Sequence, residues 1–273
     1  MSPSLFYTGK TILITGAASG IGKLFAETVA ARYDLSSLIL WDRNEDQLLE
    51  IKKQLKGTVP VETAGIDVMN FAAIQAVADT YRERGLLPDI IINSAGIVVG
   101  KMFHEHTPQE IERTLMINAA GSMWVTHAFL SEFVKRGNGV IVNIGSASAY
   151  IGNPRMSVYA SSKWAVHGWS ESLRLEMASL GSKIQICTVI PSYIDTGMFE
   201  GVKAPLFVPI LKPEEIVEKM IVGIAKGRRE IKAPFMVHLV PLLKALLPAA
   251  LFDWLAGSVL GVYRSMDNFK GKG

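Results

Sequence analysis

The sequence predicts a single α/β domain built around one parallel sheet. Short apolar segments of strand character alternate with segments of helical periodicity along the 273 residues, and this alternation is typical of parallel βαβ units. No linker, internal repeat or low-complexity segment interrupts it, and a chain of this length buries a sizeable core. We therefore expect one domain over residues 1–273.

Composition and charge exclude several classes of protein. Apolar residues make up 49% of the chain and charged residues 19%, as in ordinary soluble proteins, and a net charge of +3 does not indicate a nucleic-acid partner. The lone Cys187 cannot form an intrachain disulfide, so the fold does not depend on an oxidising compartment. The sequence has neither a signal-peptide pattern nor an apolar run of about 18 residues. A cytoplasmic protein is expected.

A strand, a glycine-rich turn and a helix open the chain. Residues 10–15 form the strand, and Gly16-Ala-Ala-Ser-Gly20-Ile-Gly22 leads into a helix that ends near residue 33. This order is the context in which backbone N–H groups cradle a pyrophosphate. Gly16 would permit the tight turn, Gly20 the approach of the phosphates, and Gly22 the close packing of helix on strand.

Three further strand ends supply candidates for a dinucleotide site. The strand 37–41 is followed by Asp42, placed where an acid binds a ribose 2′-hydroxyl, although Asp42 could instead cap the helix 44–55. An acid there favours NAD over NADP, whereas the adjacent Arg43 could serve a phosphate. Asp67 and Val68 follow the strand 59–64, where Asp67 could reach the adenine of a dinucleotide and Val68 could pack beside it. After the helix 70–84, the strand 89–92 ends in Asn93-Ser94-Ala95-Gly96, whose small residues leave room for a ligand.

One long helix is predicted from about residue 108 to 135. It contains Asn118, a polar residue in an apolar setting, which either satisfies a backbone group or serves the site. His104 and His106 precede this helix in a loop without a third ligand, so we expect a solvated loop and no metal site.

The strongest chemical signal follows the strand 140–144. This strand delivers Ser146, and after a turn at Asn153-Pro154 a helix carries Tyr159 and Lys163 on one face. A free tyrosine has a pKa of about 10, and a nearby cation lowers it. Such a tyrosine can act as general acid or base toward an alcohol or ketone oxygen, to which Ser146 could add a second hydrogen bond. The pair alone is common on helix surfaces, so its weight depends on the other motifs.

The remaining segments suggest how a substrate is enclosed. Trp164, Trp169 and Leu175 project from the helix that runs to residue 180, as core or as an oligomer contact. After the strand 183–190, the apolar loop 193–211 lies where such sheets hold ligands, which favours a lid over a hydrophobic substrate, although plain surface packing is the alternative. A helix from residue 213 and a strand at 229–232 follow.

The C-terminal segment is unusually apolar, and it is broken by Pro241, Lys244, Pro248 and Asp253. A simple membrane-spanning helix is therefore excluded. The segment could cover the active site, pack on another subunit, or lie on a membrane surface. Residues 226–273 hold eight Lys and Arg against three acids, and this local excess keeps the membrane interpretation open.

Taken together, these residues resemble the short-chain dehydrogenase/reductase family. The resemblance rests on a set of motifs in order and at family spacing: Thr15-Gly16-x-x-x-Gly20-x-Gly22, Asn93-Ser94-Ala95-Gly96, Asn118, Ser146, Tyr159-x-x-x-Lys163, and Pro191 with Thr196. Two residues depart from the common pattern. Ser94 stands where a second asparagine is common, and Ser192 stands where glycine usually follows the proline.

The resemblance implies a doubly wound, Rossmann-type, seven-stranded parallel sheet with helices on both faces. It also implies a homodimer or homotetramer. The residues themselves indicate a substrate loop at 192–212 and an apolar C-terminal helical extension at 234–273. By the resemblance, Tyr159 is the acid/base, Lys163 binds the nicotinamide ribose and lowers the tyrosine pKa, and Ser146 orients the substrate oxygen. Asn118 would hold a water of a proton relay, and Thr196 would contact the nicotinamide carboxamide.

The full set of predicted site residues follows from the motifs and the resemblance. The catalytic residues are Asn118, Ser146, Tyr159 and Lys163. The cofactor-binding residues are Thr15, Gly16, Ser19, Gly20, Ile21, Gly22, Asp42, Arg43, Asp67, Val68, Asn93, Ala95, Gly96, Tyr159, Lys163, Pro191 and Thr196.

The predicted function is hydride transfer between a nicotinamide cofactor, preferably NAD, and a hydrophobic alcohol or ketone. The ending Tyr263-Arg-Ser-Met266-Asp267-x-Phe269 is similar to the branch acting on retinoids, steroids and other lipid alcohols. An NADPH-dependent carbonyl reductase is the alternative. A catalytically silent dinucleotide sensor usually lacks the tyrosine or lysine, and a lyase-type relative lacks the glycine cradle. This chain has the tyrosine, the lysine and the glycine cradle.

Overall fold

The computed structural model describes residues 2–270, and its centre is a seven-stranded sheet in which all neighbouring strands are parallel. The spatial order is β3-β2-β1-β4-β5-β6-β7. The strands are β1 (Thr11–Thr15), β2 (Ser37–Asp42), β3 (Val61–Gly65), β4 (Ile90–Asn93), β5 (Asn138–Ile144), β6 (Lys183–Pro191) and β7 (Glu230–Ala233). The predicted parallel sheet of seven strands is confirmed.

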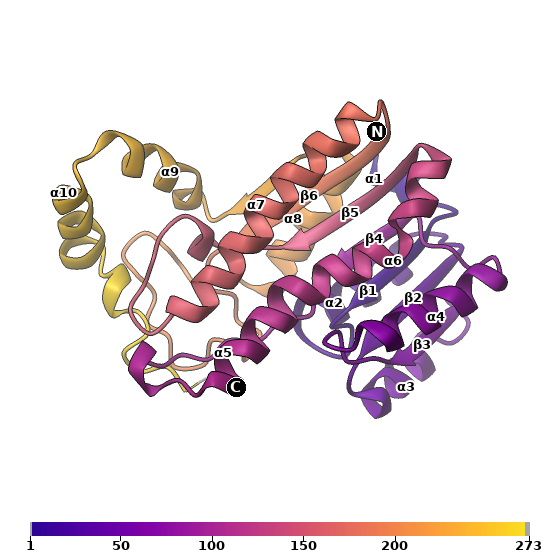
Figure 1. Cartoon of the computed structure of the whole chain (residues 1–273), viewed down its shortest axis with the longest axis horizontal. Helices are drawn as coiled ribbons and strands as arrows, with labels where there is room; N and C mark the ends of the chain where they lie inside the picture. The colour runs from indigo at the N-terminus through magenta and orange to yellow at the C-terminus, as the bar shows by residue number, and fades with distance from the viewer. Residues whose placement is uncertain (1, 271–273) are drawn as a thin grey trace.

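Helices cover both faces of this sheet, as predicted (Figure 1). Successive strand side chains point to opposite faces, so Ile12 and Ile14 enter one core cluster while Leu13 enters the other. The first face packs against α2 (Gly20–Arg32), α3 (Glu45–Gln54) and α8 (Pro213–Ala225), with the short α1 (Pro3–Tyr7) on α8. The second packs against α4 (Phe71–Glu83), α6 (Gly121–Arg136) and α7 (Ser157–Ser179).

The helix predicted over residues 108–135 is interrupted. It consists of α5 (Pro108–Leu115), a wide π turn at Met116–Ala120, and α6. The π turn carries Asn118, and insertions of this kind re-aim side chains within a helix. Helical periodicity cannot reveal such a turn, because the residues on either side keep the helical pattern. The single-helix prediction is therefore corrected.

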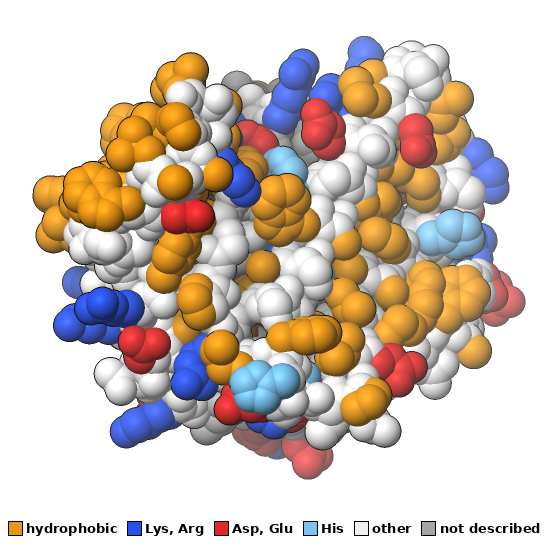
Figure 2. Space-filling view, turned by 60° about the vertical axis from the view of Figure 1, so that its left-hand side comes forward, with side chains coloured by type: hydrophobic (Ala, Val, Ile, Leu, Met, Phe, Trp, Pro, Cys, Tyr) orange, Lys and Arg blue, Asp and Glu red, His pale blue; other side chains and the backbone are white. Residues whose placement is uncertain are grey.

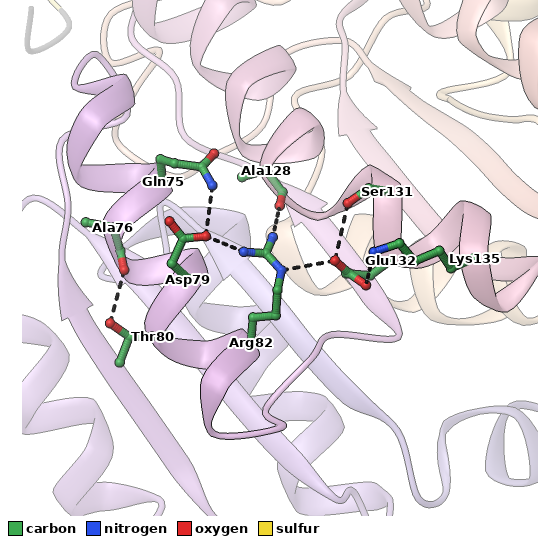
Figure 3. Close-up of polar contacts among 9 residues, drawn as sticks. All are labelled: Gln75, Ala76, Asp79, Thr80, Arg82, Ala128, Ser131, Glu132 and Lys135. Carbon is green, nitrogen blue, oxygen red and sulfur yellow. Dashed lines mark hydrogen bonds and ion pairs between the residues drawn. The ribbon is translucent and has the colours of Figure 1, made fainter.

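Side chains on α4 hold α6 in place on the second face. Arg82 forms ion pairs with Asp79 of its own helix and with Glu132 of α6, and it donates a hydrogen bond to the carbonyl of Ala128 at 3.0 Å. Figure 3 shows this guanidinium between the two helices, with Lys135 on the far side of Glu132. The contacts fix α6, and with it the π turn that precedes α6.

The three apolar residues of α7 whose role the sequence left open differ in burial. Trp169 packs against the second core cluster, whereas Trp164 and Leu175 are exposed. His106, expected in a solvated loop, has a fully buried side chain instead. His106 lies between the short 3₁₀ turn η1 (Phe103–Glu105) and the start of α5.

The C-terminal extension forms a lobe that projects beyond the sheet, drawn in gold in Figure 1. It contains α9 (Met236–Leu246), α10 (Ala249–Trp254), a π turn at Leu255–Val259 and a 3₁₀ turn at Val262–Arg264. The predicted extension 234–273 runs past the described part of the chain at residues 271–273. Within residues 2–270, no helix combines the length and the apolar character needed to cross a membrane.

The lobe is fastened to the loop that follows β6. Backbone hydrogen bonds join Leu206 N to Leu260 O at 2.8 Å and Lys203 N to Ser265 O at 2.9 Å. A bridge between Ile194 and Leu211 closes the loop at its base. The loop predicted to enclose a substrate and the apolar extension therefore form one continuous cover.

Candidate active site

A cavity opens at the carboxyl ends of the strands, where the connections from β1 and β4 run to opposite faces of the sheet. Ligands bind at this switch point in open α/β sheets. Its lining includes most of the predicted cofactor residues: Gly16, Ser19, Gly20, Ile21, Asp42, Arg43, Asp67, Val68, Ala95, Gly96, Tyr159, Lys163, Pro191 and Thr196.

The glycine turn at the start of α2 has the geometry of a phosphate cradle. Gly16 adopts a φ of +66°, and a Cβ there would lie 2.8 Å from the backbone nitrogen of Ala95, so only glycine fits. The helix begins at Gly20, and the side chain of its N-cap residue Ser19 makes no capping hydrogen bond. Backbone N–H groups at a helix N-terminus attract phosphate. The residues present therefore fit a dinucleotide pyrophosphate.

Asp42 is held in position at the end of β2. Its carboxylate accepts hydrogen bonds from Ala18 N at 3.1 Å and Asn44 N at 3.0 Å. Asn44, and not Asp42, is the N-cap of α3, because its side chain accepts from Gln47 N. This removes the helix-capping alternative for Asp42 and leaves the carboxylate in the wall of the cavity beside Arg43.

Three predicted cofactor residues lie behind the cavity wall. Thr15 Oγ1 accepts hydrogen bonds from the backbone of Ser94 and Ala95, and Asn93 Nδ2 donates to Asn143 and Thr126. A Cβ on Gly22 would lie 2.4 Å from the carbonyl oxygen of Gly16. Each residue therefore shapes the turns that line the cavity. The structure therefore places these three residues behind the cavity wall, where they support it.

The catalytic candidates converge on the inner end of this cavity. Tyr159 and Lys163 lie on α7, and both are buried. Lys163 Nζ lies 5.6 Å from the centre of the Tyr159 ring and donates to Ile144 O at 2.8 Å. Ser146 caps the short turn after β5, where its Oγ accepts from Ser148 N. A phenol, an ammonium and a hydroxyl thus line the same cavity.

Burial shifts the pKa values of Tyr159 and Lys163. It raises the pKa of Tyr159 to about 12, although a hydrogen bond with Ser146 acts in the opposite direction. Burial also lowers the pKa of Lys163 to about 8, because a charged ammonium is costly away from water. In the protein without cofactor, desolvation of the phenolate is thus the largest influence on the pKa of Tyr159, opposite in direction to the lowering expected from the sequence.

Asn118 connects the π turn to the loop after β4. Its amide accepts from Ile97 N at 2.8 Å and donates to Ile97 O at 2.9 Å and to Ser162 Oγ at 3.0 Å. A Cβ built on Gly96 would lie 3.4 Å from Asn118 Oδ1 and 3.8 Å from Lys163 Nζ. Of the two roles that the sequence left open, backbone support is the one these bonds satisfy. Asn118 Oδ1 and Lys163 Nζ both lie close to Gly96.

A second, mostly apolar cavity adjoins the first and shares Ser146, Ser192 and Phe199 with it. It lies between the loop after β6 and the C-terminal lobe. Inward-facing apolar residues of the lobe line it, including Met236, Val237, Val240, Leu243, Phe252, Leu255 and Leu260. The extension therefore closes over a cavity beside the candidate site, which matches the first of the three arrangements considered from the sequence.

Several lining residues were not singled out from the sequence. Ile66 and Ile97 follow the ends of β3 and β4, whereas Met198 and Phe199 belong to the apolar loop after β6 that the sequence did indicate. Position after a strand end would have identified Ile66 and Ile97. Among the described residues, no group of three or more His, Cys, Asp or Glu is arranged to hold a metal ion.

Comparisons with known proteins agree with this geometry. A family model described as short chain dehydrogenase matches residues 10–206. Short-chain dehydrogenase/reductase family 16C member 6 of Bos taurus is 33% identical, over 96% of this chain and 84% of its own. Epidermal retinol dehydrogenase 2 of Homo sapiens is 32% identical, over 96% and 85%. Estradiol 17-beta-dehydrogenase 11 of Homo sapiens is 33% identical, over 88% and 80%.

Solved structures share the fold. A short-chain dehydrogenase from Sphingobium yanoikuyae in complex with NADPH is 28% identical, with a TM-score of 0.72 over 97% of this chain and 98% of that one. A short chain dehydrogenase/reductase from Burkholderia phymatum in complex with NAD has a TM-score of 0.77 over 91% and 95%, at 23% identity.

Proposed function

Since the chain belongs to the short-chain dehydrogenase family and is an NAD(P)-dependent oxidoreductase acting on CH–OH groups, we propose that it transfers hydride between NAD and a hydrophobic alcohol or ketone, with Tyr159 as general acid and base. One observation carries the proposal. Tyr159 and Lys163 line the cavity with the phosphate cradle, and Ser146 lies in the wall that this cavity shares with the apolar one.

Each residue has a defined task in the oxidative direction. Ser146 Oγ positions the substrate hydroxyl, and Tyr159 as phenolate removes its proton. Lys163 in its ammonium form favours that phenolate. The nicotinamide ring, when bound, accepts the hydride that leaves the carbinol carbon, and a carbonyl product remains. In the reductive direction, neutral Tyr159 returns the proton to the carbonyl oxygen.

The apolar cavity supports a hydrophobic substrate. Its wall is formed almost entirely by aliphatic and aromatic side chains, apart from Ser146, Ser148, Asn153, Ser192 and the Tyr193 hydroxyl. Burying apolar substrate area there stabilises the complex by roughly 25 cal/mol per Å². The relatives named for retinol and estradiol point to the same substrate class, lipid alcohols. We therefore propose retinoid-, steroid- or other lipid-like alcohols and their ketones.

The cofactor preference is the finer part of the proposal, because both NAD and NADPH occur in related structures. The fixed Asp42 carboxylate supports NAD, since it would repel a 2′-phosphate. We expect wild type to bind NADH more tightly than NADPH. In Asp42→Ala, the ratio of the NADPH to the NADH dissociation constant should fall at least tenfold. Energy transfer from tryptophan to the reduced nicotinamide measures both dissociation constants.

The adjacent arginine provides the matched control for this prediction. Arg43→Ala should leave NADH binding within about twofold and weaken NADPH further. Tighter binding of NADPH than of NADH by wild type would overturn the preference and favour the carbonyl-reductase alternative. Binding of neither nucleotide would contradict the dehydrogenase assignment of the site.

We also propose that the C-terminal lobe lies on a lipid surface. Met236, Val240 and Leu243 of α9 line the apolar cavity, whereas large apolar side chains just before the helix and along one flank of it are exposed. The exposed fractions are 71% for Phe235, 55% for Leu242 and 71% for Leu246. Figure 2 shows hydrophobic side chains gathered on this lobe. Large apolar side chains exposed beside the cavity-facing residues support a second covering surface for this lobe.

The lipid proposal predicts that Leu246→Glu abolishes binding to phospholipid vesicles. Burying one leucine contributes about 1.5–3 kcal/mol, so the fraction of full-length protein that co-sediments should fall at least tenfold. Leu180→Glu is the matched control, since Leu180 is 62% exposed at the far end of α7. Equal sedimentation of both variants and wild type would contradict the proposal. Concentration-dependent dimerisation lost only in Leu246→Glu would assign the surface to a second copy.

A further inference from the structure

A triangle of hydrogen-bonded side chains lies beneath the C-terminal lobe. Asn153 Nδ2 donates to the hydroxyls of Tyr193 at 3.0 Å and Ser265 at 2.9 Å, and these two hydroxyls are 2.7 Å apart. Ser265 Oγ donates its single proton to Val262 O at 2.7 Å. Its oxygen must therefore accept from Tyr193.

The triangle joins three segments that are distant in sequence. Asn153 lies in the turn before the catalytic helix α7, Tyr193 follows β6 at the start of the substrate loop, and Ser265 belongs to the last segment of the chain. Both Asn153 and Tyr193 line the apolar cavity, whereas Ser265 is 1% exposed behind them. The C-terminal segment is thus bonded to both walls of the substrate cavity.

Aromatic contacts carry this connection to the catalytic tyrosine. The Tyr193 ring packs edge-on against Phe199 with centroids 5.3 Å apart, and Phe199 packs edge-on against Tyr159 at 6.1 Å. Met266, next to Ser265, is buried in the same cluster. The position of the Tyr193 ring therefore affects the position of the groups around Tyr159.

We propose that Ser265 is a positioning residue: through Tyr193 and Asn153 it fixes the substrate loop and the start of α7 against the catalytic tyrosine. It acts through these residues and does not itself line either of the two cavities. The backbone carbonyl of Ser265 separately accepts from Lys203 N at 2.9 Å. Ser265→Ala therefore keeps the backbone attachment of the segment and removes only the hydroxyl from the triangle.

The kinetic test, which rests on the proposed function, compares Ser265→Ala, Tyr193→Phe and the double variant. Each single change should lower kcat/KM for a hydrophobic alcohol about tenfold, mainly through KM, because buried partners lose a hydrogen bond. The double variant should be no worse than the poorer single variant, since the two hydroxyls act as a unit. The dissociation constant for dinucleotide should stay within about twofold.

Ser258→Ala is the control, because Ser258 is an exposed serine of the same lobe. Its kinetics should equal those of wild type. Wild-type kinetics in Ser265→Ala, or effects of the two changes that multiply in the double variant, would overturn the proposal.

A second readout does not depend on turnover. Backbone hydrogen exchange in the peptide covering residues 193–203 should become at least about threefold faster in Ser265→Ala than in Ser258→Ala. If wild type oxidises no alcohol, the proposed function fails, but exchange still decides the positioning role. Unchanged exchange in this peptide would overturn that role.

Discussion

Tyr159→Phe should lower the rate of alcohol oxidation by about 10²- to 10⁴-fold, the usual contribution of a positioned acid or base. The variant keeps the ring that packs against Phe199 and loses only the proton acceptor. Dinucleotide affinity should therefore stay within about twofold of wild type. Initial rates with a hydrophobic secondary alcohol, together with NADH titration, measure both quantities.

The pH dependence of wild type gives an independent check on the same residue. Burial holds the pKa of Tyr159 near 12 in the protein alone, so the phenolate fraction grows with pH below that value. Oxidation should rise with pH up to about 8, where Lys163 begins to lose the ammonium that favours the phenolate, whereas ketone reduction, which needs the neutral phenol, should not rise. Tyr33→Phe, in the core beside α1, is the control and should match wild type. A fully active Tyr159→Phe variant would falsify the mechanism.

Lys163→Met should lower kcat/KM at least about 100-fold and, unlike Tyr159→Phe, should also weaken dinucleotide binding about tenfold. The variant loses the ammonium that favours the phenolate and a charged donor in the dinucleotide cavity. If Lys163→Met bound dinucleotide as tightly as wild type, the proposed role of Lys163 in dinucleotide binding would be contradicted.

The same variant tests the electrostatic cost of burying the lysine. The fold lowers the pKa of Lys163 from 10.5 to about 8, so the unfolded chain binds more protons than the native one between these values. The contribution of Lys163 therefore makes the free energy of unfolding rise with pH from about 8 toward 10.5. Denaturant unfolding should show this rise in wild type and a smaller one in Lys163→Met.

The sequence was sufficient to predict the parallel sheet and the place of most site residues. Alternating strands and helices indicate a parallel sheet. Thr196 was identified by the family resemblance, and Asp42 by its position at a strand end. That inference works because the carboxyl ends of parallel strands share one edge.

Contacts between distant segments could not be predicted. Thr15 and Asn93 matched motifs, yet their polar groups turned out to bond within the fold. The π turn at Asn118 left no trace in the helical pattern. The triangle around Ser265 forms because the lobe packs against the loop after β6. No local sequence pattern predicts a contact between segments so far apart in the chain.

The most direct test of the account uses an alcohol deuterated at the carbinol carbon, incubated with wild type and oxidised NAD. We expect the reduced nicotinamide to contain the deuterium and the Tyr159→Phe variant to form almost none. Reduced nicotinamide without deuterium, or no reduction with any hydrophobic alcohol under conditions in which dinucleotide binds, would contradict hydride transfer as the function of this site.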